Sequence, residues 1–384
     1  MSQFLSPHAR QVSQCVDTPE RVNFLVSNCG VNGARGKNVL GRGGFGIVLK
    51  ATYRGTRVAV KVVDLHHQHC RESLENEGNI LGWKHSNIIQ ILKITSGEHH
   101  GLVIMERVSG DNLQSILNTV CIGRRSALEI LCQVASGLIY CHCRGIIHGD
   151  LKPQNILITI TDDKNGFLVK LCDFGSSFAI NEHTKGNECR GTIRYMAPEA
   201  LKAGSLSPKI DIYSFGVTMW QIKCRKVPYE EIHNNHTIAY RVVREGLRPD
   251  ICQEISRRIP KIFLNSGSLK TDYSVSPRKI KSESLNINTE NSQENLSRSL
   301  NALLKEAKIE NHVKSPVLKK KIPWRKILTS KKWIENEELA SNYRDLFTIC
   351  WHEDPKCRPE ASELLSQLQK FASKTTDNVF TLYP

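Results

Sequence analysis

The sequence predicts an α+β chain of two lobes, in which a small β-rich N-terminal lobe precedes a larger, mainly helical C-terminal lobe. Strand signals crowd residues 38–106, where short runs rich in Val and Ile are separated by glycine turns. Apolar residues then recur at helical spacing over 112–140 and 211–222. Between these two stretches lies a polar segment, residues 148–156, whose Asp and Lys residues are rarely buried without a partner.

The 384-residue chain has the composition of an ordinary soluble protein, with 40% hydrophobic and 24% charged residues. No apolar run approaches the roughly 20 residues that span a bilayer, and the first residues lack a signal pattern, so we expect no membrane association. The 13 cysteines, an odd number, are scattered. We therefore expect reduced thiols and a cytoplasmic protein.

The net charge of +15 is concentrated in one segment. Residues 257–332 hold 18 Lys or Arg against 6 Asp or Glu, an excess of 12 that leaves +3 for the rest of the chain. Because the remainder is nearly neutral, we expect no nucleic acid as a partner.

Composition divides the chain into six segments. The stretch before the last helices is rich in Ser, Asn and Lys and poor in aromatic residues, which predicts a long disordered insert in the C-terminal lobe. In order, the segments are a flexible leader (1–33), the N-terminal lobe (34–104), the first part of the C-terminal lobe (105–250), the basic insert (251–332), the last helices (333–372) and a tail (373–384).

A glycine-rich stretch opens the N-terminal lobe. Gly41, Gly43 and Gly46 follow the pattern Gly-x-Gly-x-x-Gly, which lets backbone approach phosphate groups but also occurs in dinucleotide folds. Lys61 lies 15 residues after Gly46 in a predicted strand, whereas a dinucleotide fold would place a helix directly after the glycines. The stretch therefore indicates a nucleoside triphosphate site with Lys61 beside the phosphates.

Lys61 needs a carboxylate to hold it. In the helix expected next, Glu77 shares the face of Leu74 and Leu81, whereas Glu75 points elsewhere. We expect Glu77 to pair with Lys61 and keep Glu75 as the alternative.

The polar segment holds the groups that phosphoryl transfer requires. Asp150 would accept or orient a hydroxyl proton, and Lys152 would steady the γ-phosphate. Asn155, together with Asp173 that follows 18 residues later, would hold Mg²⁺. The segment thus predicts ATP and Mg²⁺ as cofactors.

Together these motifs resemble the protein-kinase signature, a resemblance that extends to further positions. It implies that Glu199 pairs with Arg358, that Asp211 holds the catalytic-loop backbone, and that Thr192 marks a Ser or Thr acceptor. It also implies nucleotide contacts, besides the glycines and Lys61, from Leu40, Val48, Ala59, Met105 at the gatekeeper position and Glu106.

Two positions need a separate argument. Kinases commonly carry Arg immediately before the catalytic Asp, where it clamps a phosphate on the activation loop, but this chain has Gly149. We therefore predict activity without activation-loop phosphorylation, despite the candidate acceptors Ser176, Ser177 and Thr184. For Cys172, a buried packing role is favoured over a reactive thiol.

Longer stretches resemble the Mos family of serine/threonine kinases over residues 38–250 and 333–371. The stretches are Gly43-Gly-Phe-Gly, Lys50-Ala-Thr-Tyr-Arg-Gly55, Lys209-Ile-Asp-Ile-Tyr-Ser-Phe215 and Ile238-Ala-Tyr-Arg-Val-Val243. The resemblance implies a MAP kinase kinase kinase that phosphorylates MAP kinase kinase on Ser or Thr, with a role in oocyte meiotic maturation. We expect a monomer.

Two alternatives stay open, a Raf-like Ser/Thr kinase with other substrates and an inactive kinase-fold scaffold. Retention of the key ionisable and amide side chains argues against the scaffold, because inactive kinases usually lose at least one. Ser6, Ser276 and Ser315 each precede Pro. Feedback phosphorylation by a downstream MAP kinase and ordinary loop chemistry explain these pairs equally well.

Overall fold

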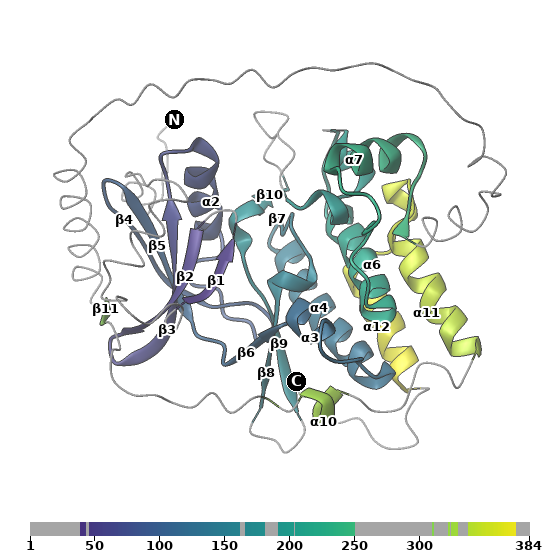
Figure 1. Cartoon of the computed structure of the whole chain (residues 1–384), viewed down its shortest axis with the longest axis horizontal. Coiled ribbons are helices and arrows are strands. Elements are labelled where there is room, and N and C mark those ends of the chain that lie inside the picture. The colour runs from purple at the N-terminus through teal and green to yellow at the C-terminus, as the bar shows by residue number, and fades with distance from the viewer. Residues whose placement is uncertain are drawn as a thin grey trace, which may run out of the picture.

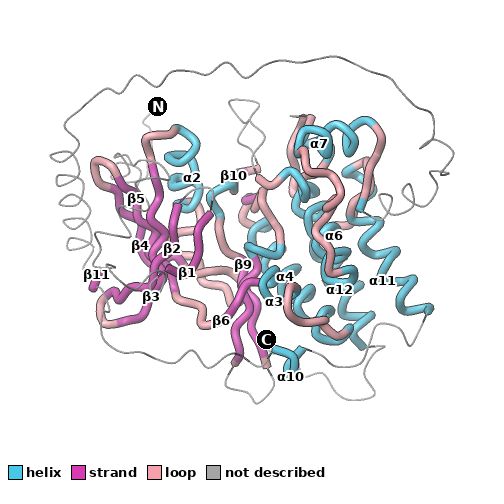
Figure 2. The backbone as a smooth tube through the Cα atoms, viewed as in Figure 1, coloured by secondary structure: helices cyan, strands magenta, loops and turns pink. Residues whose placement is uncertain are grey.

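Two lobes follow one another along the chain in the computed structural model, a sheet with one helix and then a larger body of helices (Figure 1). Figure 2 shows most strands in one half and most helices in the other, which confirms the predicted bilobal α+β architecture. The structure describes residues 39–43, 46–161, 166–180, 191–202, 204–249, 309–310, 322, 324–328 and 337–373. The predicted leader and, except for Ser373, the predicted tail lie outside these ranges.

The sheet of the first lobe has six strands, and five antiparallel strands follow one another across it while the sixth, β11 (Ile309–Glu310), pairs with β2. The five are β1 (Val39–Gly43), β2 (Gly46–Tyr53), β3 (Thr56–Asp64), β4 (Ile91–Ser96) and β5 (His100–Glu106), in the spatial order β1-β2-β3-β5-β4. The turn between β2 and β3 holds Arg54 and Gly55 at positive φ, as a two-residue hairpin requires.

The sheet is covered on both faces, which explains why β3 reads as a continuous apolar run. Val63 on β3 faces the main core, whereas Val60 faces a smaller cluster on the other side. Helix α2 (Gln68–Gly78) covers the first face. Its Leu74 packs so closely on Gly101 that a Cβ there would lie 2.4 Å from Leu74 Cδ2. This contact fixes α2, and with it Glu77, against the sheet.

The second lobe is mainly helical. Its helices are α3 (Leu113–Leu117), α4 (Arg124–Cys143), α5 (Pro198–Leu201), α6 (Lys209–Cys224), α7 (Asn235–Arg244), α10 (Trp324–Leu328), α11 (Glu337–Cys350) and α12 (Ala361–Ser373). Short strands support its catalytic face, with β6 (Gly110–Asn112), β8 (Ile156–Ile160) and β9 (Phe167–Leu171) in one sheet and β7 (Ile146–Ile147) and β10 (Phe178–Ala179) in another. Short 3-10 turns occupy Pro153–Asn155, Phe174–Ser176, Ile193–Tyr195 and Pro355–Cys357.

The predicted helical stretch 211–222 lies within α6, but the stretch 112–140 is divided into α3 and α4. Asn112 caps α3 by accepting a hydrogen bond from Ser115 N, and the chain turns before α4 begins after Gly123. Among the described helices, α4 alone is long and apolar enough to cross a membrane by length and composition. Its apolar window is 56% buried, as in a core helix, and α12 packs against it.

Part of the predicted insert belongs to the folded body, so its boundary at residue 332 is wrong. Trp324 is 6% exposed in α10, and its Nε1 donates to Asp111 Oδ2 at 2.8 Å. The buried Leu328 accepts a hydrogen bond from Gly123 N at 2.6 Å through its carbonyl. The sequence did not predict that Trp324 and Leu328 are buried, because their neighbours in the chain are basic and their partners lie some 200 residues earlier. Upstream, β11 (Ile309–Glu310) pairs with β2.

Candidate active site

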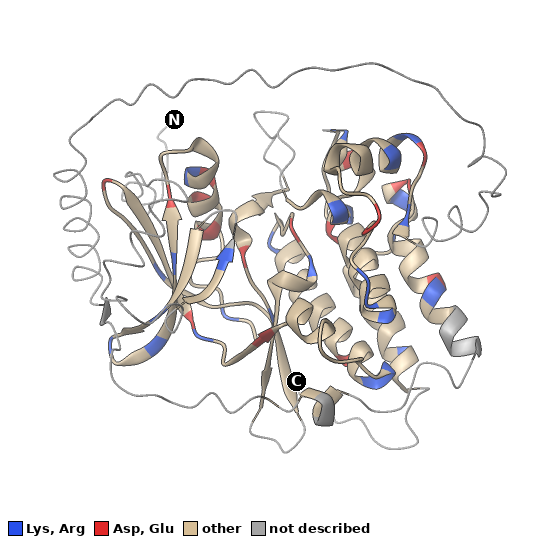
Figure 3. Ribbon diagram, in the orientation of Figure 1, with Lys and Arg blue, Asp and Glu red and all other residues tan. Residues whose placement is uncertain are grey.

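Charged residues of both signs are spread over both lobes (Figure 3). Three charged side chains meet where β3, α2 and the segment after β9 converge. Lys61 Nζ lies 2.8 Å from Glu77 Oε1 and 2.6 Å from Asp173 Oδ1. Lys61 and Glu77 are both buried, whereas the alternative partner Glu75 is exposed. The predicted pairing of Lys61 with Glu77 is confirmed.

The inner face of α2 carries Ser73, Leu74 and Glu77 at helical spacing, so burying Leu74 also turns Glu77 inward. Asn76 ties the helix to the segment that follows β9, because its Nδ2 donates to Gly175 O at 2.9 Å. Reasoning from the sequence missed Asn76. A lone amide in a helix gives no signal of a partner 99 residues away.

The three charges shift one another's pKa values. Burial alone would lower the pKa of Lys61, but Asp173 and then Glu77 outweigh it and raise that pKa well above its usual value. Burial would raise the pKa of Asp173, yet the charge and hydrogen bond of Lys61 lower it. For Glu77, burial prevails and raises the pKa. At neutral pH the cluster therefore presents an ammonium and an ionised Asp173, the charges that phosphates and a divalent cation need.

A second charged cluster lies on the catalytic loop, residues 148–155. Lys152 Nζ lies 2.5 Å from Asp150 Oδ2 and 2.7 Å from Thr192 Oγ1. Thr192 N donates to Asp150 Oδ1 at 2.8 Å. The sequence pointed to Thr192 only as a marker of the acceptor type, and its two bonds to the loop were not foreseen because it lies 40 residues or more from both partners.

The buried Asp211 holds the catalytic loop from behind, as predicted. Its Oδ1 accepts from Gly149 N and its Oδ2 from His148 N, each at 2.9 Å, and His142 Nε2 lies 2.8 Å from Oδ2. Burial would raise the pKa of Asp211, but the hydrogen bond and charge of His142 outweigh it and lower that pKa. Asp211 therefore stays a carboxylate that fixes two consecutive backbone amides.

The predicted structural ion pair of the second lobe is also present. Arg358 Nη1 and Nη2 donate to Glu199 Oε1 and Oε2 at 2.5 and 2.9 Å. Arg358 is buried, and two parallel bonds between planar groups fix their relative orientation. The pair joins α5, at the end of the activation segment, to the turn before α12.

Four of the residues predicted to line the nucleotide share one face of the sheet. Ala59 on β3 pairs with Met105 on β5, and Val48 on β2 pairs with Lys61. Gly46 passes so close to β3 that a Cβ would lie 1.9 Å from Val62 O. The remaining predicted lining residues are Leu40, which is 42% exposed on β1, Gly41 and Gly43 on the same strand, and Glu106 at the end of β5.

Asn155 and Asp173 offer one amide oxygen and one carboxylate. Asn155 Nδ2 donates to Asp150 O at 2.8 Å, which leaves its Oδ1 as the acceptor. These hard oxygen donors fit a divalent cation such as Mg²⁺, which binds through one or two protein carboxylates and completes its shell with phosphate oxygens and water. Within the described residues no cluster of three or more His, Cys, Asp or Glu could hold an ion without those further ligands.

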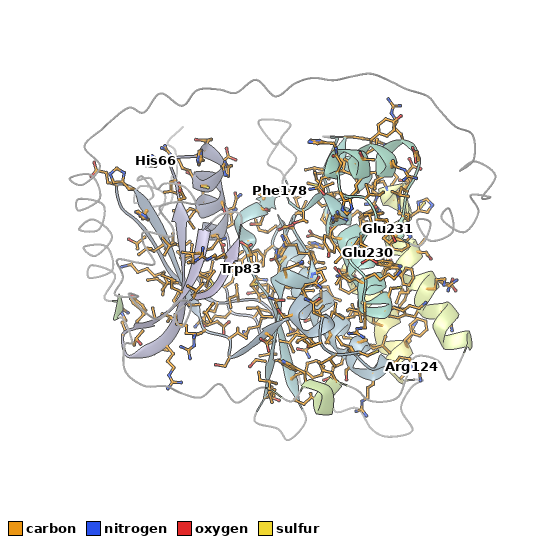
Figure 4. All side chains as sticks on the ribbon, in the orientation of Figure 1. His66, Trp83, Arg124, Phe178, Glu230 and Glu231 are labelled. Atoms are coloured by element: carbon orange, nitrogen blue, oxygen red, sulfur yellow. The ribbon has the colours of Figure 1, made fainter. Side chains whose placement is uncertain are left out.

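The backbone at Gly149 has a conformation and a close contact that a residue with a Cβ would not fit. Its φ is +74°, and a Cβ there would lie 2.6 Å from Ser176 O and 3.4 Å from Phe178, which lies between the two lobes (Figure 4). Ser176 and Ser177 are only 3% and 0% exposed, so neither is accessible for phosphorylation in this conformation. Thr184, the third candidate acceptor, lies outside the described residues.

The same glycine contact continues into the activation segment. Gly191 has a φ of +105°, and a Cβ there would lie 2.5 Å from Gly149 O. Two glycines thus let the segment pass backbone against backbone over the catalytic loop, one residue before Thr192 reaches Asp150.

Cys172 precedes Asp173 and donates its backbone N–H to Asn155 O at 3.0 Å. Burial first, and the nearby carboxylates second, raise the pKa of its thiol well above the usual value. A thiol held neutral is a poor nucleophile, which favours the packing role.

Comparison with known proteins matches residues 35–368 to a family model described as "Protein kinase domain". That domain uses ATP and a divalent metal. The chain is 36% identical over 228 residues to "Serine/threonine-protein kinase mos" of Patiria pectinifera, an alignment that covers 56% of this chain and 63% of the relative.

Two vertebrate relatives give a similar picture. The chain is 34% identical over 245 residues to "Serine/threonine-protein kinase mos" of Gallus gallus, covering 56% of this chain and 68% of the relative. It is 33% identical over 237 residues to "Proto-oncogene serine/threonine-protein kinase mos" of Mus musculus, covering 55% and 66%. The chain therefore spans between about three fifths and two thirds of each of these relatives.

Proposed function

This chain belongs to the Mos family of serine/threonine protein kinases, and on that premise we propose that it transfers the γ-phosphate of ATP to Ser or Thr of a MAP kinase kinase. The observation that carries the proposal is the position of Lys152 between Asp150 and Thr192. That arrangement sets one cation beside one candidate base, where a substrate hydroxyl would enter.

Each protein group has a separate part in the transfer. Asp150 accepts the proton of the substrate hydroxyl and orients its oxygen. Lys152 supplies positive charge where the transferred phosphoryl group gains negative charge, and Lys61 holds the α and β phosphates while Glu77 holds Lys61. Bound Mg²⁺ would neutralise phosphate charge, and Asn155 and Asp173 would hold it.

The wider setting is part of the same proposal. The chain would activate a MAP kinase cascade in oocyte meiotic maturation, as a monomer in the cytoplasm. Feedback by the downstream MAP kinase would act on Ser6, Ser276 and Ser315, which lie outside the described residues. The close packing at Gly149 supports activity without activation-loop phosphorylation, because a backbone contact holds the segment that a phosphate clamp would otherwise hold.

The test is transfer of labelled phosphate from Mg-ATP to a catalytically inactive MAP kinase kinase, comparing the chain with its Asp150→Asn variant. We expect transfer that disappears in the variant. Labelling of a generic Ser/Thr protein but not of MAP kinase kinase would favour the alternative, a Raf-like Ser/Thr kinase with other substrates. No labelling by a folded protein would make the chain a scaffold.

A further inference from the structure

A second ion pair joins the two lobes where the chain crosses between them. Glu106 is the last residue of β5, and residues 107–109 lead from it to β6 in the second lobe. Lys170 lies on β9 of the second lobe, and its Nζ is 2.8 Å from Glu106 Oε1. The pair therefore closes a short bridge beside the crossing.

Glu106 is fixed by further bonds. Gln90 N donates to Glu106 Oε1 at 2.8 Å, and Glu106 N donates to Gln90 O at 2.9 Å. Lys170 Nζ also donates to Ile88 O at 3.4 Å. One carboxylate oxygen thus accepts from a backbone amide and an ammonium at once, an arrangement stronger than a neutral hydrogen bond. It sets both the backbone and the side chain of Glu106.

Packing in the core of the second lobe does not require a lysine at position 170. Along β9, Val169 and Leu171 are buried in the core, and Lys170 points to the opposite side. Its side chain is 12% exposed and that of Glu106 is 29% exposed, so solvent screens the pair only in part. The charge at position 170 therefore acts on Glu106 rather than on the core.

The bridge lies close to the Lys61 cluster along the chain, although Glu106 is in register with Val58 of β3 rather than with Lys61. Lys61 pairs with Val103 on β5, three residues before Glu106, and Asp173 follows three residues after Lys170. Three residues of strand span about 10 Å. Two ion pairs, Lys61–Asp173 and Glu106–Lys170, thus connect the same lobes, from the neighbouring strands β3 and β5 to the segment that runs from β9 to Asp173.

The two pairs differ in what a nucleotide would do to them. Lys61 and Asp173 would turn toward phosphates and metal, so their mutual bond weakens when the site fills. The side chains of Glu106 and Lys170 instead bond to each other and to the backbone of Gln90 and Ile88, and neither is among the groups expected to hold phosphate or metal. We therefore expect the second pair to keep its geometry when a nucleotide binds.

We propose that Glu106 and Lys170 are positioning residues that hold the crossing segment, and the spacing between the lobes, in the arrangement that binds the adenine end of ATP. This inference rests on the proposed function, because it places the nucleotide between β3 and the crossing segment. A positioning role of this kind changes nucleotide affinity more than it changes the rate of the chemical step.

The experiment compares the full chain with Lys170→Met, Lys170→Arg and the control Lys93→Met, a half-buried lysine on β4. Calorimetry gives the Kd of metal-free ADP, kinetics give KM for ATP and kcat, and thermal unfolding gives Tm. We expect Lys170→Met to raise Kd and KM about threefold to tenfold while kcat stays within about twofold. Lys170→Arg should restore both values, and Lys93→Met should leave them unchanged.

An unchanged ADP Kd in Lys170→Met, with or without a lower Tm, would overturn the inference and leave the proposed function intact. If Lys170→Met fails to fold, Glu106→Gln is the second variant, because its amide oxygen still accepts from Gln90 N while the charge is lost. It should raise the ADP Kd by a similar factor. Failure of the unmodified chain to bind ADP would overturn the inference and the proposed function together.

Discussion

Lys61 and Lys152 belong to different lobes and are held in different ways. The carboxylates around Lys61 come from α2 and from the segment after β9, 16 and 112 residues away along the chain. The carboxylate beside Lys152 is Asp150, two residues away in the same loop. The first cluster therefore depends on how three elements pack, whereas the second is largely built into one loop.

Because the two lysines are held in different ways, a change in the packing of the first lobe can alter the Lys61 cluster without altering the groups of the catalytic loop. A movement of α2 would part Lys61 from Glu77 without touching Asp150, because Asp211 holds the catalytic loop independently through two backbone amides. Regulation that acts on the first lobe should thus alter the Lys61 cluster alone. Changes to the catalytic loop should alter the rate with little effect on the first lobe.

The largest expected effect comes from the local cluster. Asp150→Asn removes the candidate base, and we expect kcat to fall by about 10³- to 10⁴-fold. The ADP Kd should stay within about twofold, because the Lys61 cluster and the sheet are untouched. Steady-state kinetics and calorimetry on one preparation measure both, and a loss of less than tenfold would refute the role of Asp150.

Lys61→Met tests the cluster that depends on packing. It leaves two carboxylates in a largely buried site without their cation, which should cost about 3 kcal/mol of stability near pH 8. The cost should shrink at pH 5, because one of the two carboxylates then takes up a proton.

In the wild-type chain the contribution of Asp173 to stability should not change over this pH range. The lowered pKa of Asp173 contributes stability that is present above its unfolded value and is lost as pH falls through its folded value. That window lies below about pH 4, so between pH 5 and pH 8 this contribution is constant. Urea denaturation of both proteins at the two pH values measures the difference. An equal cost of Lys61→Met at pH 5 and pH 8 would contradict this account.

Gly149→Ala disturbs the local cluster through the backbone. The positive φ costs about 1–2 kcal/mol for a residue with a Cβ, and the Ser176 carbonyl must also move. We expect a total loss of about 2–3 kcal/mol of stability together with reduced kcat. Gly145→Ala is the matched control, since Gly145 has a φ of +73° with no atom within 4 Å of the added Cβ. Equal losses in the two variants would mean that the contact with Ser176 is unimportant.

Glu77→Gln should cost less free energy than the replacement of Lys61 by Met, because Lys61 keeps Asp173 as a partner. We expect kcat/KM to fall by about 30-fold, which corresponds to about 2 kcal/mol for a charged hydrogen bond. Glu75→Gln is the control on the same helix and should leave kcat/KM unchanged, because Glu75 is exposed. An equal fall of kcat/KM in the two variants would indicate that Glu75 pairs with Lys61 in solution.

The smallest effect is expected from the candidate phosphorylation sites. Replacing Ser176, Ser177 and Thr184 by Ala should leave kcat within about threefold, a change of at most about 0.7 kcal/mol. Phosphatase treatment of the unmodified chain should give the same result. Abolished activity in a folded triple variant would show that Gly149 does not replace the phosphate clamp.

The sequence predicted the local motifs of the site better than it predicted the contacts between distant segments. The spacing of residues 148–156 and the inward face of α2 were enough to assign Asp150, Lys152 and Glu77, because those groups lie in or next to periodic elements. The contacts of Thr192, Asn76 and Lys170 were not predicted. Each joins segments at least 40 residues apart, and no local pattern reports which distant atom a polar side chain will meet.

The insert shows the same limit. A Ser-, Asn- and Lys-rich composition predicted disorder through residue 332, yet Trp324 and Leu328 are buried. Five residues of α10 are too few to form a helix by themselves. They form one because Asp111 and Gly123 supply hydrogen bonds that only the folded lobe presents.

By itself the sequence determined the two lobes, the order of the motifs and the candidates for the reacting groups, because periodicity and spacing are local properties of the chain. The tertiary structure alone decided that Lys61 is shared between Glu77 and Asp173, that Gly149 and Gly191 meet backbone to backbone, and that Lys170 reaches Glu106. These contacts depend on distances between segments that folding brings together, and burial then sets their charge states.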